Sequence, residues 1–201
     1  MRHSLKNINH LFDWKKLYKE KKQWNNQIIQ DLRSNHAGET GAVYIYKGAK
    51  TAVKMSPFLI SRKAVRFTIN HLQTEKTHLK CFDRLLDKKQ VSKLLPLWKM
   101  SGFCLGFFST FFFLERGLFI TIVEVETFVE KHYLDQIKKH EKYPHTLKLL
   151  NYCCKDEIHH KEEAEEYLKN LNGNQNQRSM IFWRSVIQKG SSFAVWICKK
   201  I

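Results

Sequence analysis

Two glutamate–histidine pairs with the same spacing are the clearest chemical feature of this sequence. Glu75 and His78 stand in "TEKTHLK", and Glu157 and His160 stand in "DEIHHK". Residues i and i+3 of a helix share a face, so each pair can offer a carboxylate oxygen and an imidazole nitrogen to one metal ion. A single pair is weak evidence, because Glu and His are common on solvated helices, but two pairs are stronger.

Each pair is preceded in the chain by a further glutamate that lies in an apolar stripe. Glu39 has Leu32, Val43 and Tyr46 at helical spacing, and Glu126 is placed in the same way among Phe, Ile and Val residues. A carboxylate in such a stripe is costly unless it is paired or binds metal. Either glutamate alone could instead be half-exposed with its stem packed.

The order of a glutamate followed by a pair therefore occurs twice, which predicts two helix pairs related by a pseudo-twofold axis. All six side chains would then surround one centre, as in the di-iron carboxylate proteins with ferritin-like bundles. Four carboxylates balance the charge of two ferrous ions, and ligands rich in oxygen suit iron or manganese better than zinc. Two such ions can reduce dioxygen together, so the chemistry indicated is oxidation or oxygenation. The predicted metal ligands, which are also the predicted catalytic residues, are Glu39, Glu75, His78, Glu126, Glu157 and His160.

The elements that must position these residues are long helices. Apolar residues recur with a period of 3.6 over roughly 25–54, 58–88, 98–140 and 145–171, with a shorter segment at 179–200. Pro57, Pro96 and Pro144 mark the breaks, and "NGNQNQ" at 172–177 is a polar linker. We therefore expect an all-α, ferritin-like four-helix bundle followed by an extra amphipathic or hydrophobic C-terminal helix.

Composition sets the domain organisation and the class of partner. The 201 residues fit one domain at 25–201, preceded by a basic and mobile N-terminal arm at 1–24. The 35 Lys and Arg against 19 Asp and Glu give a charge of +16, which favours a polyanion, either nucleic acid or an anionic membrane surface. The five cysteines form no CxxC pair and are expected to be reduced packing residues.

Two segments are more apolar than a soluble bundle requires. Residues 95–123 hold an apolar run of about 14 residues before Glu115, short of the roughly 20 that a spanning helix needs. Residues 179–201 mix Trp, Phe and Ile with Arg and Lys, which is typical of a helix in a membrane interface. We expect both segments to associate with a membrane; the alternative is that both are buried core.

Several phrases of the sequence resemble the demethoxyubiquinone hydroxylase family of ubiquinone biosynthesis. They are "NHAGETGAVYIYKGA", "EKTHLKCF", "LLPLWKMSGFCLGFFS", "VEVETFVEKHYLDQI", "DEIHH" and "VIQKGSSFAVWICKKI", in order from about residue 28 to the C-terminus. The resemblance implies a di-iron monooxygenase, using dioxygen, that hydroxylates the ring of a polyprenylated demethoxy-benzoquinone or quinol. Such a substrate lies in the bilayer.

The resemblance also implies how the ligands are shared. One iron would be held by Glu39, Glu75 and His78 and the other by Glu126, Glu157 and His160, with Glu75 and Glu157 as bridges. The motif selects Glu126 rather than Glu124 or Glu130, and helical phase excludes only Glu124. The family has an acidic residue where this chain has Lys161.

Residues around the ligands carry further expectations. His132 and Tyr133 match the family's "HY" pair and would lie near the quinone or assist proton and electron delivery, or simply pack. His36 or Asp156 could hydrogen-bond a ligand, whereas His159 is expected to point outward. Gly38 and Gly41 flank Glu39, and their missing side chains would let a neighbouring helix or the quinone ring approach.

Two other functions fit parts of the pattern: a di-iron hydroxylase acting on tRNA, and a non-catalytic iron-binding or scaffold protein of the quinone pathway. The basic residues are mostly Lys and the aromatics lie in apolar runs, so no nucleic acid is expected. Further expectations are NADH as the reductant, contacts with other quinone-biosynthesis proteins and a homo-oligomer. We place the protein on the cytoplasmic side of a bacterial inner membrane, with the mitochondrial matrix side as the alternative.

Overall fold

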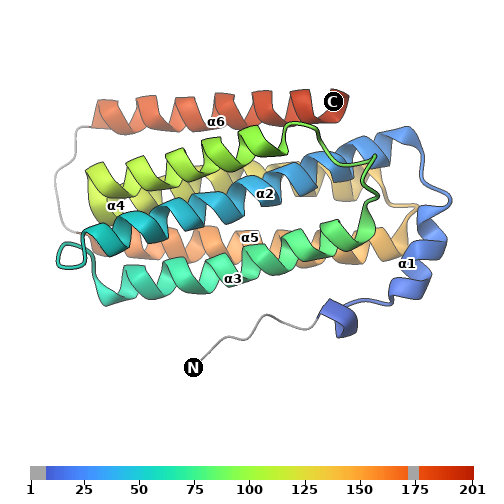
Figure 1. Cartoon of the computed structure of the whole chain (residues 1–201), viewed down its shortest axis with the longest axis horizontal. Coiled ribbons are helices and arrows are strands. Elements are labelled where there is room, and N and C mark those ends of the chain that lie inside the picture. Colours follow the sequence, from blue (N-terminus) through green and yellow to red (C-terminus); the bar gives the residue numbers. More distant parts are fainter. Residues whose placement is uncertain (1–7, 172–176) are drawn as a thin grey trace.

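The computed structural model describes residues 8–171 and 177–201, and the described residues contain helices and no strand. A short 3-10 helix, Ile8–His10, precedes α1 (Trp14–Lys21). The longer helices are α2 (Asn26–Met55), α3 (Arg62–Leu85), α4 (Leu95–Lys139), α5 (Pro144–Asn170) and α6 (Gln177–Lys200). The all-α prediction is confirmed (Figure 1). Of the predicted linker at 172–177, only Gln177 lies within the described residues, and it begins α6.

Local signals in the sequence set where these helices begin. Asn25 caps α2 by accepting a hydrogen bond from the Ile28 amide (3.0 Å), and Ser61 caps α3 in the same way through the Ala64 amide (3.2 Å). Pro144 is the first residue of α5, where its missing N–H leaves no donor unsatisfied. The predicted boundaries therefore agree closely with the observed ones.

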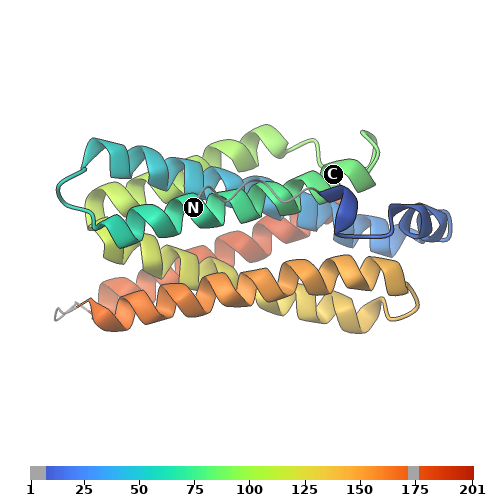
Figure 2. The same ribbon diagram turned by 90° about the horizontal axis from the view of Figure 1, so that it is seen from below.

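The predicted single helix over 98–140 is in fact two helices. Leu114 has φ 53° and ψ −141°, the only positive φ of a non-glycine residue in the described chain. At this residue the chain turns back, so that the two halves of α4 meet at one end of the molecule (Figures 1 and 2). The four-helix bundle is formed by α2, α3, the second half of α4 and α5, while the first half of α4 lies against α2.

Glycines allow this close contact between the first half of α4 and α2. A Cβ built on Gly106 would lie 1.9 Å from the Ile45 carbonyl oxygen, and one on Gly102 would lie 2.4 Å from that of Gly41. By contrast, a Cβ on Gly38 or Gly41 would meet no described atom within 4 Å. The first half of α4 thus contacts the carbonyl oxygen of Gly41, whereas the space beside the Cα atoms of Gly38 and Gly41 is open.

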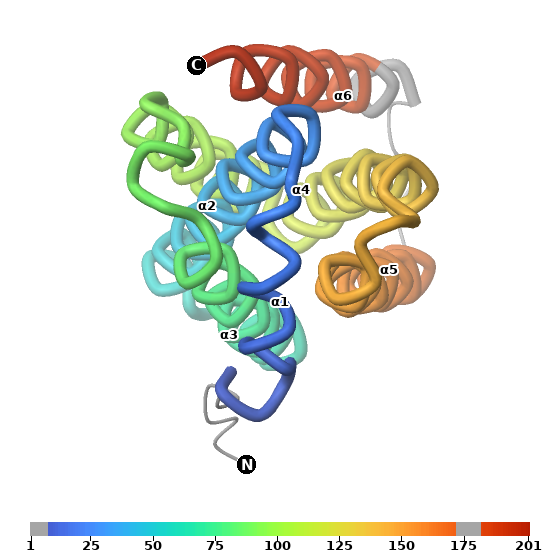
Figure 3. The backbone as a smooth tube through the Cα atoms, turned by 90° about the vertical axis from the view of Figure 1, so that its right-hand side faces the viewer, coloured from blue at the N-terminus to red at the C-terminus, as the bar shows by residue number. Residues whose placement is uncertain are grey.

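The N-terminal segment is packed from Ile8 onward rather than mobile. Trp14 and Leu17 are buried against the end of the bundle, where α1 crosses it (Figure 3). Glu20 caps α5, because its carboxylate accepts hydrogen bonds from the amides of His145 (2.9 Å) and Thr146 (2.7 Å). Pairing with these free amides explains how a buried carboxylate is tolerated in α1.

The last helix is fastened to the bundle by polar contacts at several points. Lys199 places its Nζ 2.7 Å from the buried carboxylate of Asp31 in α2. Asp31 also receives Lys139 Nζ and His140 Nε2, each at 2.8 Å. Burial alone would raise the pKa of Asp31, but these three donors lower it to about 2. Figure 3 shows α6 along one side of the bundle.

Candidate metal centre

The six predicted ligands come together in the middle of the bundle. Each of the four bundle helices contributes at least one of them, and every one of the six side chains is 4% exposed or less. The His78 Nδ1 atom lies 2.9 Å from a carboxylate oxygen of Glu157 and 3.4 Å from Glu39. The His160 Nδ1 atom lies 2.9 Å from Glu75 and 3.1 Å from Glu157.

The six predicted ligands divide into two overlapping groups. In each group, one atom from every residue lies within 4.8 Å of the others, which is close enough to share a metal ion. Glu75 and Glu157 belong to both groups, the position expected of bridging carboxylates. The first group is Glu39, Glu75, His78 and Glu157, and the second is Glu75, Glu126, Glu157 and His160.

The inward-facing atoms of this cluster have no hydrogen-bond partner among the described residues. Both oxygens of Glu75 and of Glu157 are buried and unpaired, and the same holds for one oxygen each of Glu39 and Glu126. The Nδ1 atoms of His78 and His160 are unpaired as well. Buried polar atoms are almost always satisfied, so eight such atoms without hydrogen bonds in one cluster are suited to binding cations. Four carboxylates and two imidazoles are the donor set that a di-iron centre requires.

Electrostatics in the protein without metal agree with this. Burial, together with repulsion from neighbouring carboxylates, raises the pKa of Glu75 and of Glu126 well above the usual range. Burial would also raise the pKa of Glu157, but the close imidazoles of His160 and His78 lower it instead. Like charges this close cannot all ionise without a cation, so the cluster must hold either protons or metal.

Groups outside the cluster orient the ligands from behind. Asp156 accepts a hydrogen bond from His78 Nε2 at 3.0 Å, which turns Nδ1 toward the cluster. The Tyr133 hydroxyl donates a hydrogen bond to Glu39, and His71 stacks edge-on against His160 with ring centroids 4.0 Å apart. Partners of this kind fix the direction of a metal ligand.

Of the two residues expected to support a ligand, Asp156 does so and His36 does not. The Nε2 atom of His36 contacts Asp83 at 2.8 Å, at the edge of the bundle. The support from His71 was not foreseen, although its place four residues before Glu75 puts it on the same helical face. His159 is exposed, as expected.

Glu124 and Glu130, the two alternatives to Glu126 as a metal ligand, form ion pairs outside the cluster. Glu124 pairs with Arg184 of α6 at 2.8 Å and accepts a hydrogen bond from Gln188. Glu130 pairs with Lys161, the residue that directly follows His160. Both carboxylates are thus neutralised by cations outside the cluster.

His132 lies outside the ligand cluster. Its Nε2 contacts Ser34 Oγ at 3.0 Å and Gln136 at 2.7 Å. It also lines a cavity of about 270 Å³ between α4 and α6, beside Phe128 and Gln188. Burial lowers the pKa of His132 to about 4, so its ring is neutral near pH 7. Tyr133, the next residue, donates a hydrogen bond to Glu39, so His132 lines the cavity whereas Tyr133 faces the cluster.

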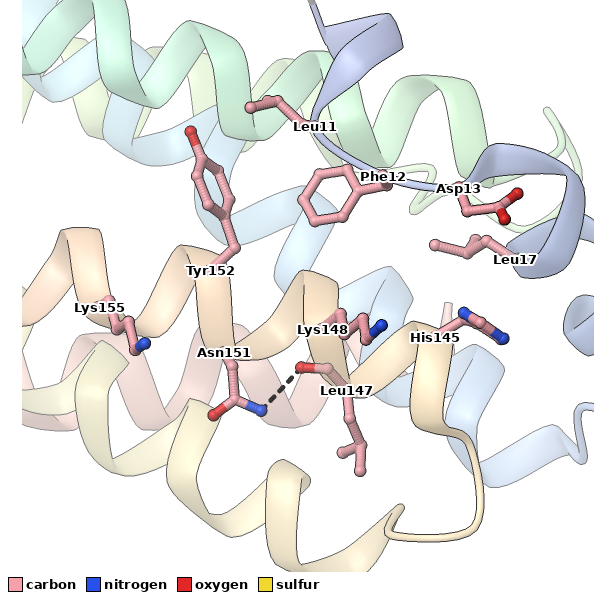
Figure 4. Close-up of a pocket in the computed structure, with 10 residues that line it drawn as sticks. All are labelled: Leu11, Phe12, Asp13, Leu17, His145, Leu147, Lys148, Asn151, Tyr152 and Lys155. Carbon is pink, nitrogen blue, oxygen red and sulfur yellow. Dashed lines mark hydrogen bonds between the residues drawn. The ribbon is translucent and has the colours of Figure 1, made fainter.

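A larger hollow of about 520 Å³ lies between the N-terminal segment and α5 (Figure 4). None of the six ligands lines it, and the nearest connection is Tyr152, whose ring centroid is 5.6 Å from that of His78. Phe12 packs edge-on against Tyr152 and shares the wall. The chemistry of the cluster is therefore not located in this hollow.

Comparison with known proteins gives a single answer. The model of the family described as "Ubiquinone biosynthesis protein COQ7" matches residues 26–198. The NADPH-dependent 3-demethoxyubiquinone 3-hydroxylase of Rattus norvegicus is 29% identical over 181 residues, 86% of this chain and 77% of the rat protein. The corresponding protein of Caenorhabditis elegans is 30% identical, covering 87% of this chain and 90% of its own length. The 3-demethoxyubiquinol 3-hydroxylase of Rhodospirillum rubrum is 29% identical over 178 residues, 87% of this chain and 78% of its own.

Proposed function

Because this chain belongs to the COQ7 family of ubiquinone biosynthesis proteins, we propose that it is a monooxygenase that hydroxylates the ring of a demethoxyubiquinone or its quinol. The relatives named above carry this activity in their names. The observation that carries the proposal for this chain is the buried cluster of four carboxylates and two imidazoles with unpaired inward atoms.

The residues of the cluster would hold two iron ions. Glu39 and His78 would hold one, Glu126 and His160 the other, and Glu75 and Glu157 would bridge them. Bound iron would supply the electrons that activate dioxygen. The protein's own part is to fix the ligands: Asp156 holds the tautomer of His78, and Tyr133 restrains Glu39.

The open space at Gly38 and Gly41 supports an approach for the substrate to Glu39. Gly38 directly precedes this residue, Gly41 follows it by two positions, and Gly38 is exposed. A flat quinone ring entering there would meet backbone rather than side chains. Because the space is not filled by another helix, its use by substrate accounts for two residues that weaken helix α2.

Membrane association is proposed to occur at the end of the molecule where α4 turns. One helix among the described residues, α4, is long and apolar enough by composition to cross a membrane, but its turn at Leu114 divides it. Phe58 is 98% exposed in the connection between α2 and α3, and Phe112 and Phe113 are exposed just before the turn. Ser61 donates a backbone hydrogen bond to Glu115, which places these two apolar segments together.

Basic residues surround this apolar end. Lys54, Arg62 and Lys63 are exposed on the helices beside it. Exposed aromatics at a tip with basic neighbours suit insertion into an anionic membrane surface, where a polyprenyl substrate is dissolved. We expect Phe58→Ser to reduce flotation with anionic vesicles. The control is Leu134→Ser, an exposed apolar position outside residues 95–123 and 179–201, which should leave flotation unchanged.

The reductant is proposed to be NADPH rather than NADH. The mitochondrial relatives are named as NADPH-dependent enzymes, and no feature of this sequence favoured NADH on physical grounds. Parallel turnover assays with the two nucleotides decide between them. Higher activity with NADH would contradict this part of the proposal.

Complementation tests the function as a whole. A bacterial strain that lacks its own demethoxyubiquinone hydroxylase should regain ubiquinone when this chain is expressed. The Glu157→Ala variant, expressed to the same level, should not restore it, because one carboxylate shared by both metal positions is lost. Accumulation of demethoxyubiquinone despite good expression of the unmodified chain would overturn the proposal.

A further inference from the structure

A thiol lies beside one of the two metal positions and has no part in the proposed hydroxylation. Cys153 belongs to α5, one helical turn before Glu157, and is fully buried. Its Sγ atom, a carboxylate oxygen of Glu39 and a ring nitrogen of His78 all lie within 4.8 Å of one another. One metal ion could therefore contact all three.

The other two donors of this group are already oriented for a metal. Asp156 holds His78 through Nε2, and the Nδ1 atom has no hydrogen-bond partner in the described part of the chain. Tyr133 donates to one oxygen of Glu39, while the Oε2 atom is buried without a partner among those residues. Both side chains are thus restrained, with one free donor atom each.

The second metal position has no equivalent thiol. Cys153 stands four residues before Glu157, and the residue four before Glu75 is His71. His71 does not offer its Nε2 to the cluster, because that atom contacts Glu163 at 2.8 Å. The pseudo-symmetric centre is therefore chemically unequal, with sulfur on the Glu39–His78 side only.

We propose that Glu39, His78 and Cys153 form a three-ligand site for a divalent metal ion of borderline softness, best matched by Zn²⁺. Zinc prefers nitrogen and sulfur ligands in tetrahedral sites, often with water in the fourth position. One carboxylate and one thiolate balance its charge. On binding, the S–H bond of Cys153 breaks, a sulfur–metal bond forms, and the proton leaves to solvent.

This site overlaps the position of one iron. Glu39 and His78 cannot bind both ions at once, so zinc would leave only the Glu126–His160 side for iron. That consequence rests on the proposed function, whereas zinc binding itself does not. Zinc would then act as an inhibitor that competes with iron and not with quinone.

Metal titration of the full-length, metal-free protein tests the proposal. The test variant is Cys153→Ser. The matched control is Cys154→Ser, because Cys154 is the neighbouring residue and is also buried, but its thiol is not part of the three-residue group. Zinc affinity is measured by competition with a chromophoric chelator. Cobalt(II), which replaces zinc and absorbs in the near ultraviolet when bound to thiolate, reports the sulfur ligand directly.

The expected result is one tight zinc ion per chain and a thiolate–cobalt band, both retained in Cys154→Ser. Cys153→Ser should lose the band, and its zinc affinity should fall by more than about 100-fold. Loss of a residue that only orients a ligand costs about 10–100-fold, so a larger loss indicates a direct ligand. Circular dichroism checks folding. X-ray absorption spectroscopy of the zinc-loaded, unmodified chain gives a second readout that needs no variant, because a zinc–sulfur distance of about 2.3 Å identifies a thiolate ligand.

Cobalt bound without the band, equal zinc affinity in the two variants, or a zinc spectrum without a sulfur ligand would overturn the inference. The iron content of Cys153→Ser distinguishes failure of the zinc site from failure of the proposed function, because the six proposed iron ligands are intact in that variant. Two irons per chain without a zinc effect would refute only the zinc site. Zinc binding without an iron pair would refute only the di-iron proposal.

Discussion

Replacement of the bridging Glu75 by Gln should change stability in opposite directions with and without metal. Both oxygens of this fully buried carboxylate lack partners in the described structure, and repulsion from Glu157, Glu39 and Glu126 adds to its burial cost. Keeping this buried carboxyl protonated at pH 7, well above the usual carboxyl pKa, costs about 1–3 kcal/mol at about 1.4 kcal/mol per pKa unit, and a neutral glutamine avoids that cost. The metal-free variant should therefore be more stable than the unmodified protein by about that amount.

The thermal shift follows from the size of the chain. For a protein of this length, 1 kcal/mol moves Tm by about 2–4 °C, so metal-free Glu75→Gln should melt about 2–12 °C higher. An ion at 100 times its Kd stabilises by about 2.7 kcal/mol. Two ions should thus raise the Tm of the unmodified protein by about 10–20 °C, and Glu75→Gln should lose most of this gain.

Differential scanning calorimetry with and without Mn²⁺ measures both effects without oxygen chemistry. The exposed Glu162→Gln variant on α5 is the control and should follow the unmodified protein in both conditions. A lower metal-free Tm for Glu75→Gln, or an unchanged gain with Mn²⁺, would refute the assignment of Glu75 as a bridging ligand.

Three other predictions follow from single contacts. Asp31→Asn should lower the free energy of unfolding at pH 7 by about 2 kcal/mol, measured with urea. Because the folded pKa of Asp31 is lowered to about 2, the stabilisation in the unmodified protein should be lost as pH falls from about 4 to 2; equal stability of both proteins at pH 7 would contradict it. Gly106→Ala should destabilise by about 1–3 kcal/mol through its contact with Ile45, whereas Gly41→Ala should not, since its Cβ meets no described atom within 4 Å; chemical denaturation compares them, and equal losses would argue against the close packing. Tyr133→Phe removes the hydrogen bond to Glu39 and should reduce metal affinity or quinone turnover about 10–100-fold, by titration and product analysis; no change in either would leave the tyrosine a packing residue.

The sequence was sufficient for the bundle and for the grouping of the ligands. Helical phase placed Glu39 and Glu126 inside, and it excluded Glu124, which the structure pairs with Arg184. Phase could not decide on Glu130, because its partner Lys161 lies on another helix and pairing between helices leaves no local pattern. Glu75 could be grouped with His78, and Glu157 with His160, because i, i+3 spacing is a property of the helix itself.

The turn at Leu114 and the role of the N-terminal segment could not be read in advance. Leu114 follows a run of phenylalanines without Gly or Pro, so no local signal marks the reversal of α4. Glu20 looks like one charge in a lysine-rich arm, and only the three-dimensional structure shows that it caps α5. The sequence also gives no sign that Cys153 lies near the cluster, since a lone cysteine in a helix is most often a packing residue.

We propose that this chain inserts an oxygen atom from dioxygen into a demethoxyquinone ring, with two irons held by the bundle supplying the electrons. The most direct measurement is mass spectrometry of the product formed by the iron-loaded protein under ¹⁸O₂, with NADPH and a short-tailed demethoxyquinone in anionic vesicles. We expect two irons per chain and one ¹⁸O atom in each new ring hydroxyl, with no product from Glu157→Ala. Product oxygen from water, or no product from a protein that holds two irons, would contradict it.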